Sequence, residues 1–191
     1  MERPTLLQLI DRAADEQWEE LDLSGWELTE LPSQVGKLTQ LKRLVLGTCD
    51  EEKNQCVGIG LKALPAEVEQ LTNLSELILS GNQFTEIPEC VMKLSKLDIL
   101  NLAQNQLIEI ASSITSLTNL KKLDLWGNQL HEIPGCIGNL TNLTWLTLNQ
   151  NQISEIPVCI GNLTNLTWLA LHQNQISEIP VCIGEIGRAH V

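Results

Sequence analysis

Residues 71–93 read LTNLSELILSGNQFTEIPECVMK, and this pattern returns with a period of 23 residues along the chain. Apolar side chains recur at unit positions 1, 4, 7, 9, 14, 17 and 21, forming a stripe that only neighbouring units can bury. Each enclosed leucine or isoleucine stabilises a fold by roughly 1.5–3 kcal/mol, so stacked units predict one continuous core. The units begin at Asp15, Leu38, Leu71, Leu94, Leu117, Leu140 and Leu163.

Each unit also contains the signals of a strand, a turn and a return limb. Apolar and polar residues alternate at unit positions 6 to 10, which is typical of a strand. An asparagine at position 12 can satisfy backbone groups where the chain leaves the strand, and a proline at position 18 fixes the return limb. A short helical turn through Val91, Ile137 or Ile160 then leads into the next strand. The asparagines are Asn82, Asn105, Asn128, Asn151 and Asn174; the prolines are Pro32, Pro65, Pro88, Pro134, Pro157 and Pro180, with Ala111 in the fourth unit.

The pattern L-x-x-L-x-L-x-x-N-x-L, met for example by residues 74–84 and 166–176, resembles the leucine-rich repeat. The resemblance covers residues 15–184 as seven repeats. It implies an α/β fold: a right-handed curved solenoid with a parallel sheet on the concave face and short helical turns on the convex side. Two departures stand out. Trp26 replaces the asparagine of the first unit, and ten extra residues within GTCDEEKNQCVGIG (47–60) predict a looped insertion in the second.

Residues 1–14 predict a helical cap for the solenoid. Leu6, Leu9, Ile10, Ala13 and Ala14 are spaced for one helical face, and Thr5 fits an N-cap. This helix, followed by WEELDLSGWELTELPSQVGKLTQLKRLVLG (18–47), resembles the start of bacterial Roco-type proteins, in which such repeats precede a Ras-like GTPase module. The sequence contains no G-x-x-x-x-G-K-[ST] motif, so the resemblance implies a context and no activity.

The last residues, EIGRAHV (185–191), leave the repeat pattern, which would continue NLTNL. They resemble the translation of a sequencing adapter, GAG ATC GGA AGA GCA CAC GTC. We interpret this non-repeat tail as read-through onto a fragment from metagenomic reads; a natural tail is the alternative. An array that stops within the stack would leave the apolar residues of its last unit without a neighbour, which predicts end-to-end self-association. These residues include Leu166, Leu169, Leu171 and Ile179.

Composition narrows the classes of partner. Twenty-four acidic and 12 basic residues give a net charge of −12, which repels nucleic-acid phosphates and anionic lipid surfaces. No run approaches the roughly 18 apolar residues of a membrane span, and the first residues lack a signal-peptide core. We therefore expect a cytoplasmic protein with neither nucleic acid nor membrane as partner.

Three histidines and six cysteines form no nucleophile, base or metal constellation, so we expect no enzyme activity, cofactor or metal. A column of cysteines at unit position 20 is best explained as small, partly buried residues copied by duplication; a metal or disulfide column is the minority alternative. Cys49 and Cys56 share the insertion and could pair under oxidation, although a cytosolic location favours free thiols. The column contains Cys90, Cys136, Cys159 and Cys182 and is broken by Ser113.

The concave face carries the candidate binding site, because unit positions 5, 6, 8, 10 and 11 are not needed for the core. With strands roughly 4.8 Å apart, Trp145 and Trp168 should lie side by side, forming an apolar patch with a polar rim. The tryptophans are interpreted as interface anchors, and a duplicated, stacked cross-strand ladder is the alternative. Position 6 reads Glu20, Arg43, Glu76, Ile99, Lys122, Trp145 and Trp168. The predicted partner-binding residues are Ile99, Lys122, Asp124, Trp126, Trp145, Trp168 and His172.

These features predict a non-catalytic scaffold that binds a protein or peptide on its concave face. The alternative is the truncated sensing arm of a Roco-type GTPase whose catalytic module is missing. Carbohydrate binding by the tryptophans is a weaker hypothesis, because few polar groups stand among the aromatic rings.

Overall fold

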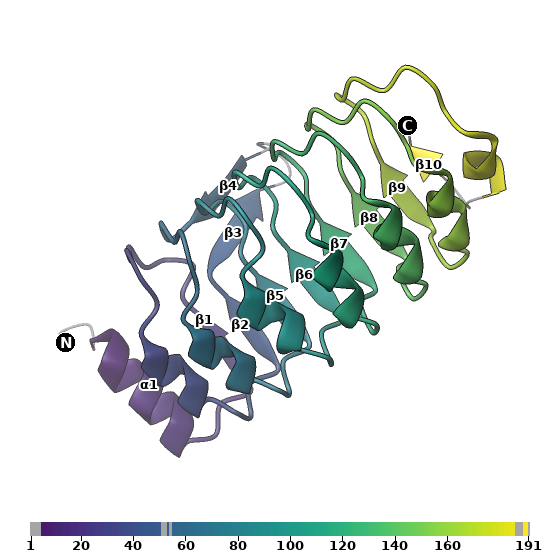
Figure 1. The fold of residues 1–191 in the computed structure, drawn as a ribbon. Coiled ribbons are helices and arrows are strands. Elements are labelled where there is room, and N and C mark those ends of the chain that lie inside the picture. The colour runs from purple at the N-terminus through teal and green to yellow at the C-terminus, as the bar shows by residue number, and fades with distance from the viewer. Residues whose placement is uncertain (1–4, 51–52, 54, 186–188, 191) are drawn as a thin grey trace.

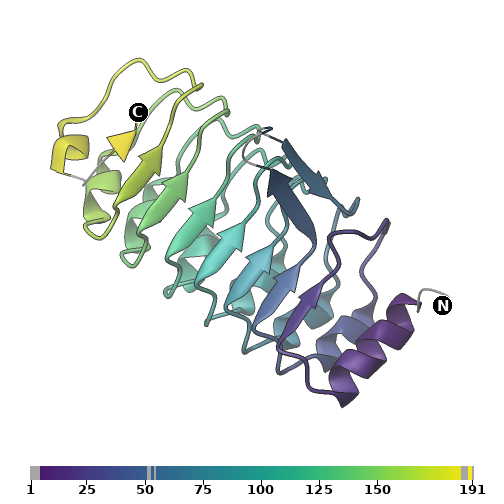
Figure 2. The same ribbon diagram turned by 180° about the vertical axis from the view of Figure 1, so that it is seen from behind.

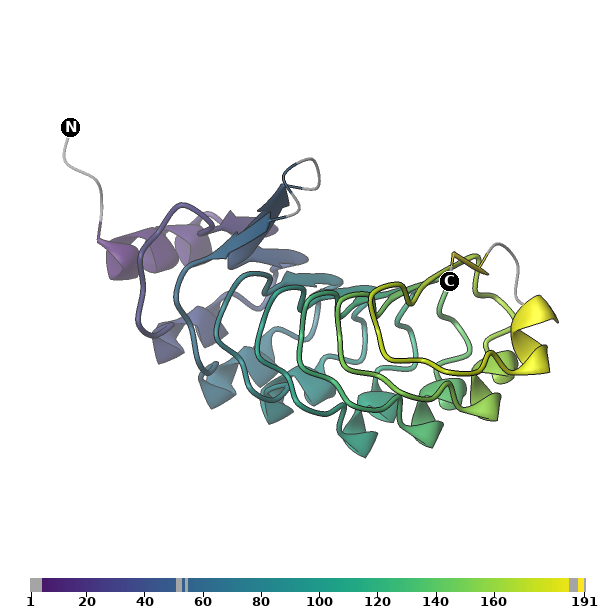
Figure 3. The same cartoon turned by 90° about the horizontal axis from the view of Figure 1, so that it is seen from above.

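The computed structural model describes residues 5–50, 53, 55–185 and 189–190. A parallel sheet lines one side of a curved solenoid, and short 3-10 turns line the other (Figures 1 and 3). The strands follow one another in the order β1-β2-β5-β6-β7-β8-β9-β10, seen from the sheet side in Figure 2. Their bounds are β1 Glu20–Asp22, β2 Arg43–Val45, β5 Glu76–Ile78, β6 Ile99–Asn101, β7 Lys122–Asp124, β8 Trp145–Thr147, β9 Trp168–Ala170 and β10 Ala189–His190. The predicted leucine-rich-repeat fold is confirmed.

The core is a set of aliphatic columns running through the stack. The central residue of each repeat strand points inward and is at most 2% exposed, from Leu21 in β1 to Leu169 in β9. On the opposite side each 3-10 turn contributes a buried aliphatic residue, such as Val91 or Ile137. The prolines at unit position 18 stand directly before these turns, and Ala111 takes that place before η4. The turns are η1 Ser33–Lys37, η2 Ala66–Gln70, η3 Glu89–Lys93, η4 Ser112–Ser116, η5 Gly135–Asn139, η6 Val158–Asn162 and η7 Val181–Glu185.

The recurring asparagines form the predicted hydrogen-bonded ladder. In Asn128, Oδ1 accepts a bond from Leu107 N in the preceding repeat at 3.0 Å. Its Nδ2 donates to Leu102 O, also in the preceding repeat, and to Leu125 O, both at 3.0 Å. Buried backbone groups at the turn out of each strand are thereby satisfied. Asn82, Asn105, Asn128 and Asn151 are buried, and Asn174 is half-buried.

Helix α1, Leu6–Asp15, covers the N-terminal end of the core with Ile10 and Ala13. The hydroxyl of Thr5 accepts a hydrogen bond from Gln8 N at 3.3 Å, and Gln8 Oε1 accepts one from Thr5 N at 2.9 Å. These two bonds form a capping box, which satisfies otherwise orphan donors at the helix start. The helix and its N-cap Thr5 lie where the sequence places them, and residues 1–4 of the predicted cap lie outside the described residues.

The insertion differs from the expected loop, because it forms an antiparallel hairpin of β3 (Gly47–Asp50) and β4 (Gln55–Gly58). Cys49 and Cys56 are direct cross-strand partners and form a disulfide. The expectation of free thiols here is wrong, since antiparallel pairing brings the two residues together. In Figure 3 the hairpin rises from the sheet side of the solenoid. Residues 51, 52 and 54 of the insertion lie outside the described residues.

The C-terminal end also differs from expectation. Strand β10 pairs in parallel with β9, with Ala189 opposite Leu169, so the outer edge of β9 is not left open. Leu166, Leu169 and Leu171 are buried, whereas Ile179 is 55% exposed. The predicted open apolar edge is therefore wrong for three of its four residues. Residues 186–188 and 191 of the tail lie outside the described part of the chain, and the origin of the tail stays a prediction.

Candidate functional site

The sheet aligns residues of equal unit position across the whole array. Ile99 pairs with Lys122 and Trp145 with Trp168, each 23 residues apart, and Arg43 pairs with Glu76 because the ten inserted residues of the second repeat leave the register unchanged. The face therefore has two zones along position 6: a charged zone over β1, β2 and β5, and an aromatic zone over β8 and β9. Ile99 and Lys122 lie between them.

Trp145 and Trp168 make the central feature of the aromatic zone. Their ring centroids are 4.6 Å apart and their planes are inclined by 7°, so the indoles are stacked. Both side chains are half-buried, which leaves part of the ring surface accessible at the sheet face. Lys122, on the adjacent strand, places Nζ 5.8 Å from the centroid of the Trp145 ring, within cation–π range. The stack is therefore an aromatic surface bordered by a lysine.

The polar rim predicted around the tryptophans is only partly accessible. Asp124 Oδ1 accepts hydrogen bonds from Trp126 N at 3.1 Å and from the hydroxyl of Thr147. These bonds fix the end of β7 and engage one carboxylate oxygen. His172 is exposed beyond the end of β9, and its carbonyl accepts a bond from Gln150 N at 3.0 Å.

Trp126 does not lie on the accessible face, contrary to expectation. It is 8% exposed and forms a small buried cluster with Ala103 and Cys56, against which Cys49 packs. Cys56 N donates to Gln104 Oε1 at 2.7 Å, and Gln104 N donates to Trp126 O at 2.6 Å, linking the hairpin to this cluster. The hairpin of the second repeat thus covers a tryptophan of the fifth. Trp126 supports the hairpin rather than presenting a ring to a partner.

The charged zone contains an arginine clamp that the sequence analysis missed. Arg43 forms salt bridges with Glu20 and with Glu76, the latter at 3.0 Å. The hydrogen bond to Glu76 is the main cause that raises the pKa of the guanidinium, and the bond to Glu20 adds to it. The alternation Glu20, Arg43, Glu76 at one unit position was the available signal, because parallel strands in strict register bring these three side chains together.

The cysteine column is explained by packing on the convex side. A Cβ added to Gly138 would lie 3.1 Å from Cys159 Cβ, and one added to Gly161 would lie 2.8 Å from Cys182 Cβ. Cys159 and Cys182 therefore each lie against the glycine two positions beyond the cysteine of the preceding repeat. In the part of the chain that the structure describes, no group of three His, Cys, Asp or Glu side chains could hold a metal ion.

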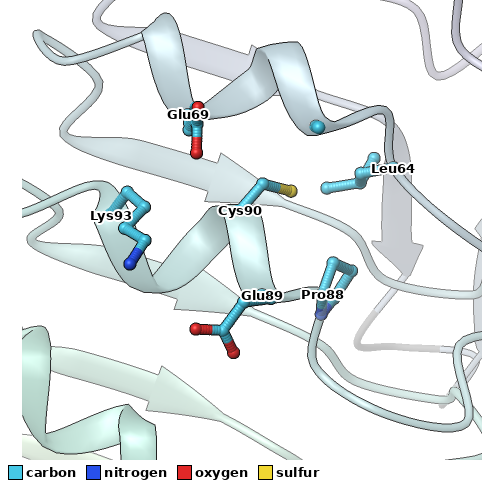
Figure 4. A pocket seen from close by; sticks show the side chains of 7 residues that line it. Leu64, Glu69, Pro88, Glu89, Cys90 and Lys93 are labelled. Atoms are coloured by element: carbon cyan, nitrogen blue, oxygen red, sulfur yellow. The ribbon is translucent and has the colours of Figure 1, made fainter.

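Cys90 borders a convex hollow of about 260 Å³ with Leu64, Glu69, Pro88 and Lys93 (Figure 4). Burial raises the pKa of its thiol to about 11, and the nearby carboxylates of Glu69 and Glu89 act in the same direction. A buried thiol with a high pKa is a poor nucleophile, which argues against a catalytic role for this hollow.

The rate of alkylation tests whether the Cys90 thiol is buried. At pH 8, iodoacetamide is expected to modify Cys90 about 100-fold more slowly in the folded protein than in urea, because so little thiolate is present. Peptide mass spectrometry of timed samples measures the rate, and the half-buried Cys159 serves as an internal reference. Equal rates for Cys90 in the two conditions would contradict the burial of its thiol.

A double-mutant cycle measures the tryptophan stack. Trp145→Ala, Trp168→Ala and the double variant are expected to give a coupling energy of about 1 kcal/mol, as stacked aromatic pairs do. Urea unfolding supplies the free energies. A coupling near zero would mean that the stack contributes nothing to stability and would remove the cross-strand ladder as its explanation.

Comparison with known proteins agrees with this architecture. A family model described as leucine rich repeat matches residues 118–176, and a second of the same description matches residues 73–94. No curated protein sequence matches the chain. None of the described helices is long and apolar enough to cross a bilayer.

Solved structures share the fold along most of the chain. A leucine-rich repeat protein of Leptospira interrogans is 35% identical with a TM-score of 0.78, covering 90% of this chain and 43% of its own. The leucine-rich repeat ectodomain of the Arabidopsis thaliana receptor kinase GASSHO1/SCHENGEN3, in complex with CASPARIAN STRIP INTEGRITY FACTOR 2, is 30% identical with a TM-score of 0.68 and coverages of 92% and 24%. An internalin of Listeria monocytogenes is 25% identical with a TM-score of 0.70 and coverages of 89% and 46%. The chain thus spans less than half the length of these structures. The repeat register, the asparagine ladder and these matches together make this chain a leucine-rich repeat protein.

Proposed function

We propose that this chain is a non-catalytic scaffold that binds a protein or peptide on the sheet face, with the stacked Trp145 and Trp168 as its anchor. The observation that carries the proposal is the half-buried aromatic stack on a face whose other residues are mostly polar. Large aromatic rings dominate interface energies, and stacking across rigid strands keeps the entropic cost of ordering them low.

Structural neighbours support the same class of function. The Arabidopsis ectodomain was solved with CASPARIAN STRIP INTEGRITY FACTOR 2 bound, and another neighbour, the plant peptide hormone receptor RGFR1, with RGF2. The leucine-rich repeat is typically a protein-interaction module, and a rigid curved sheet suits an extended ligand. Lys122 borders the proposed anchor, Ile99 lies one strand beyond Lys122 on β6, and His172 is exposed past the end of β9.

Peptide selection tests the proposed anchor. Peptides selected from a random library on the wild-type protein are expected to bind the double variant Trp145→Ala, Trp168→Ala at least about 30-fold more weakly, as for hot-spot residues. Val158→Ala, on the exposed convex side, is the matched control and should change nothing. Peptides that bind the double variant as tightly as the wild type would disprove this site.

The sensing arm of a Roco-type GTPase remains a second proposal, favoured by the capping helix followed by the insertion-bearing second repeat. Long-read sequencing of the source DNA beyond the codon for Gly184 tests it. Further repeats leading to a phosphate-binding loop would support this proposal, whereas a stop codon directly after the tail would reject it.

Location and self-association also stay proposals. In the cytoplasm the Cys49–Cys56 disulfide would have to resist reduction by cellular thiols. Thiol alkylation in intact cells measures whether these two cysteines are oxidised or reduced. Self-association through the last repeat would use its exposed apolar residues, and light scattering at high concentration tests it. These residues are Ile179, 55% exposed, and Val181, 94% exposed.

A further inference from the structure

The hairpin of the second repeat is held to the body of the solenoid in two parts. At its base, Gly58 N donates a hydrogen bond to Gly81 O at 3.0 Å. Nearer the tip, Cys56 N donates to Gln104 Oε1 at 2.7 Å, and Cys56 belongs to the same buried cluster as Trp126. The base contact does not involve the disulfide, whereas the part over Trp126 contains one of the two bonded cysteines.

The disulfide restrains the part of the hairpin that covers Trp126. Cys49 and Cys56 are direct cross-strand partners with a sequence separation of 7. A two-stranded hairpin is marginally stable by itself in water, so a cross-link within it has a large effect. Closing a loop of this length restricts the lifted state and favours the docked one by roughly 50-fold in the closure-entropy model. Breaking the disulfide therefore shifts the hairpin toward the lifted state.

The covered tryptophan contains a polar group that opposes its own burial. Trp126 is 8% exposed, and its buried Nε1 has no hydrogen-bond acceptor among the residues that the structure describes. A buried donor without a partner costs free energy, and water can supply that partner once the hairpin lifts. Burial of the ring stabilises the docked hairpin, but the unpaired N–H lowers the free energy needed for release.

One of the two sulfur atoms is within reach of a reductant. Cys49 is half-buried and lines a second hollow, of about 280 Å³, on the sheet face, whereas Cys56 is 8% exposed. A thiolate of a dithiol attacks Cys49 Sγ and breaks the S–S bond, and Cys56 leaves as a thiolate that takes up a proton. The second thiol of the reagent then displaces the Cys49 sulfur and gives it a proton. Two electrons pass to the protein, which ends with two thiols, and the dithiol becomes a disulfide.

We propose that the Cys49–Cys56 disulfide is a redox-controlled latch that covers a further anchor of the binding surface. Trp126 follows β7, and Trp145 begins the adjacent strand β8. Unit positions 6 and 10 point to the same side of the sheet, so these two residues are roughly 14 Å apart on one face. Reduction adds Trp126 to the aromatic zone formed by Trp145 and Trp168. The part of Trp126 in binding rests on the proposed function, whereas the latch itself does not.

Exchange of the indole N–H groups with solvent tests the latch without a ligand. In protein that contains isotope-labelled tryptophan, the Trp126 N–H is expected to exchange about 50-fold faster after reduction with dithiothreitol. The indole N–H groups of Trp145 and Trp168 should exchange at unchanged rates. The four other cysteines are free thiols, so the reductant acts on this disulfide. Equal exchange of the Trp126 N–H in both redox states would overturn the latch.

Two variants separate opening of the disulfide from other effects of dithiothreitol. The double variant Cys49→Ala, Cys56→Ala should show the fast Trp126 exchange without reductant and should not respond to it. Cys159→Ala keeps the disulfide and should respond as the wild type does. Slow exchange in the double variant, equal to that of the oxidised wild type, would also count against the latch.

Peptide binding tests Trp126 as an added anchor. Peptides selected from a random library on the reduced protein are expected to bind the oxidised protein about 10-fold more weakly, and Trp126→Ala should abolish this difference. Equal affinity of the wild type in the two redox states would overturn the role of Trp126 in binding. If neither form yields a binding peptide while the indole exchange still responds to reduction, the proposed function has failed and the latch has not.

Discussion

Asn82→Ala is expected to lower the free energy of unfolding by about 4 kcal/mol. The substitution removes the amide oxygen that accepts hydrogen bonds from three backbone N–H groups, and these buried groups are left unpaired. Asn82 Oδ1 accepts from Ile59 N and Gly60 N at 3.1 Å and from Leu61 N at 3.0 Å. Its Nδ2 also donates to Leu46 O at 2.8 Å, which ties the chain on both sides of the hairpin to the third repeat. Urea unfolding followed by circular dichroism measures the loss.

Asn174→Ala is the matched control, because Asn174 makes the same kind of bonds at the last asparagine position but is half-buried. Water can replace its lost contacts, so we expect a loss of about 1 kcal/mol. Equal losses for the two variants would show that burial does not set the strength of the ladder.

Gly81→Ala is expected to displace the hairpin while the repeats remain folded. Gly81 has a φ of +70°, and an added Cβ would lie 2.5 Å from Gly58 N and 2.7 Å from Val57 C, which are backbone atoms of the hairpin. Backbone cannot move aside as a side chain can, so the hairpin must lift. Trp126 would then lose its cover, and its fluorescence should shift to the red as water reaches the ring.

Gly127→Ala separates the steric effect from the backbone strain. Gly127 has a similar φ of +68°, but its added Cβ would meet the side chain of Gln104, with Cγ at 2.9 Å, before any backbone atom. Gln104, Gln150 and Gln173 occupy the same unit position with φ between 49° and 57°, so this conformation is tolerated without glycine. We expect a cost of about 1–2 kcal/mol and a smaller fluorescence shift than for Gly81→Ala, because the displaced Gln104 side chain holds the hairpin only through its bond from Cys56 N. Identical spectra for the two variants would contradict the proposed contact.

The repeat register was predictable because its signals are local and periodic. A 23-residue period sets which strand residues become neighbours, and the stacked pair Trp145–Trp168 follows from it directly. The asparagine ladder follows too, since an amide at a fixed position in every unit meets the same backbone groups each time. Fold and tryptophan stack could therefore be derived without coordinates.

The hairpin and its consequences could not be derived in this way. The insertion occurs once, so no period locates its contacts, and the same sequence allowed both a loop and a hairpin. Burial of Trp126 depends on where that hairpin lies, three repeats away from its own unit. The arginine clamp follows from a different kind of signal: the column at unit position 6 was examined only for partner-binding residues, whereas the sheet pairs Glu20 with Arg43 across strands.

The asparagine ladder and the hairpin together limit how such a protein can change its length. Asn105, Asn128 and Asn151 each connect their repeat to the preceding one through the same hydrogen bonds, so these three connections are interchangeable. The ladder alone would allow whole units to be gained or lost at each of these places, of which only the one at Asn151 lies beyond the repeat that contains Trp126. The hairpin forbids this between its own repeat and the one that contains Trp126, because a deletion there would move the covered ring out of reach. Growth and shrinkage of the array are thus confined to the units after Trp126, where two neighbouring copies are nearly identical in sequence.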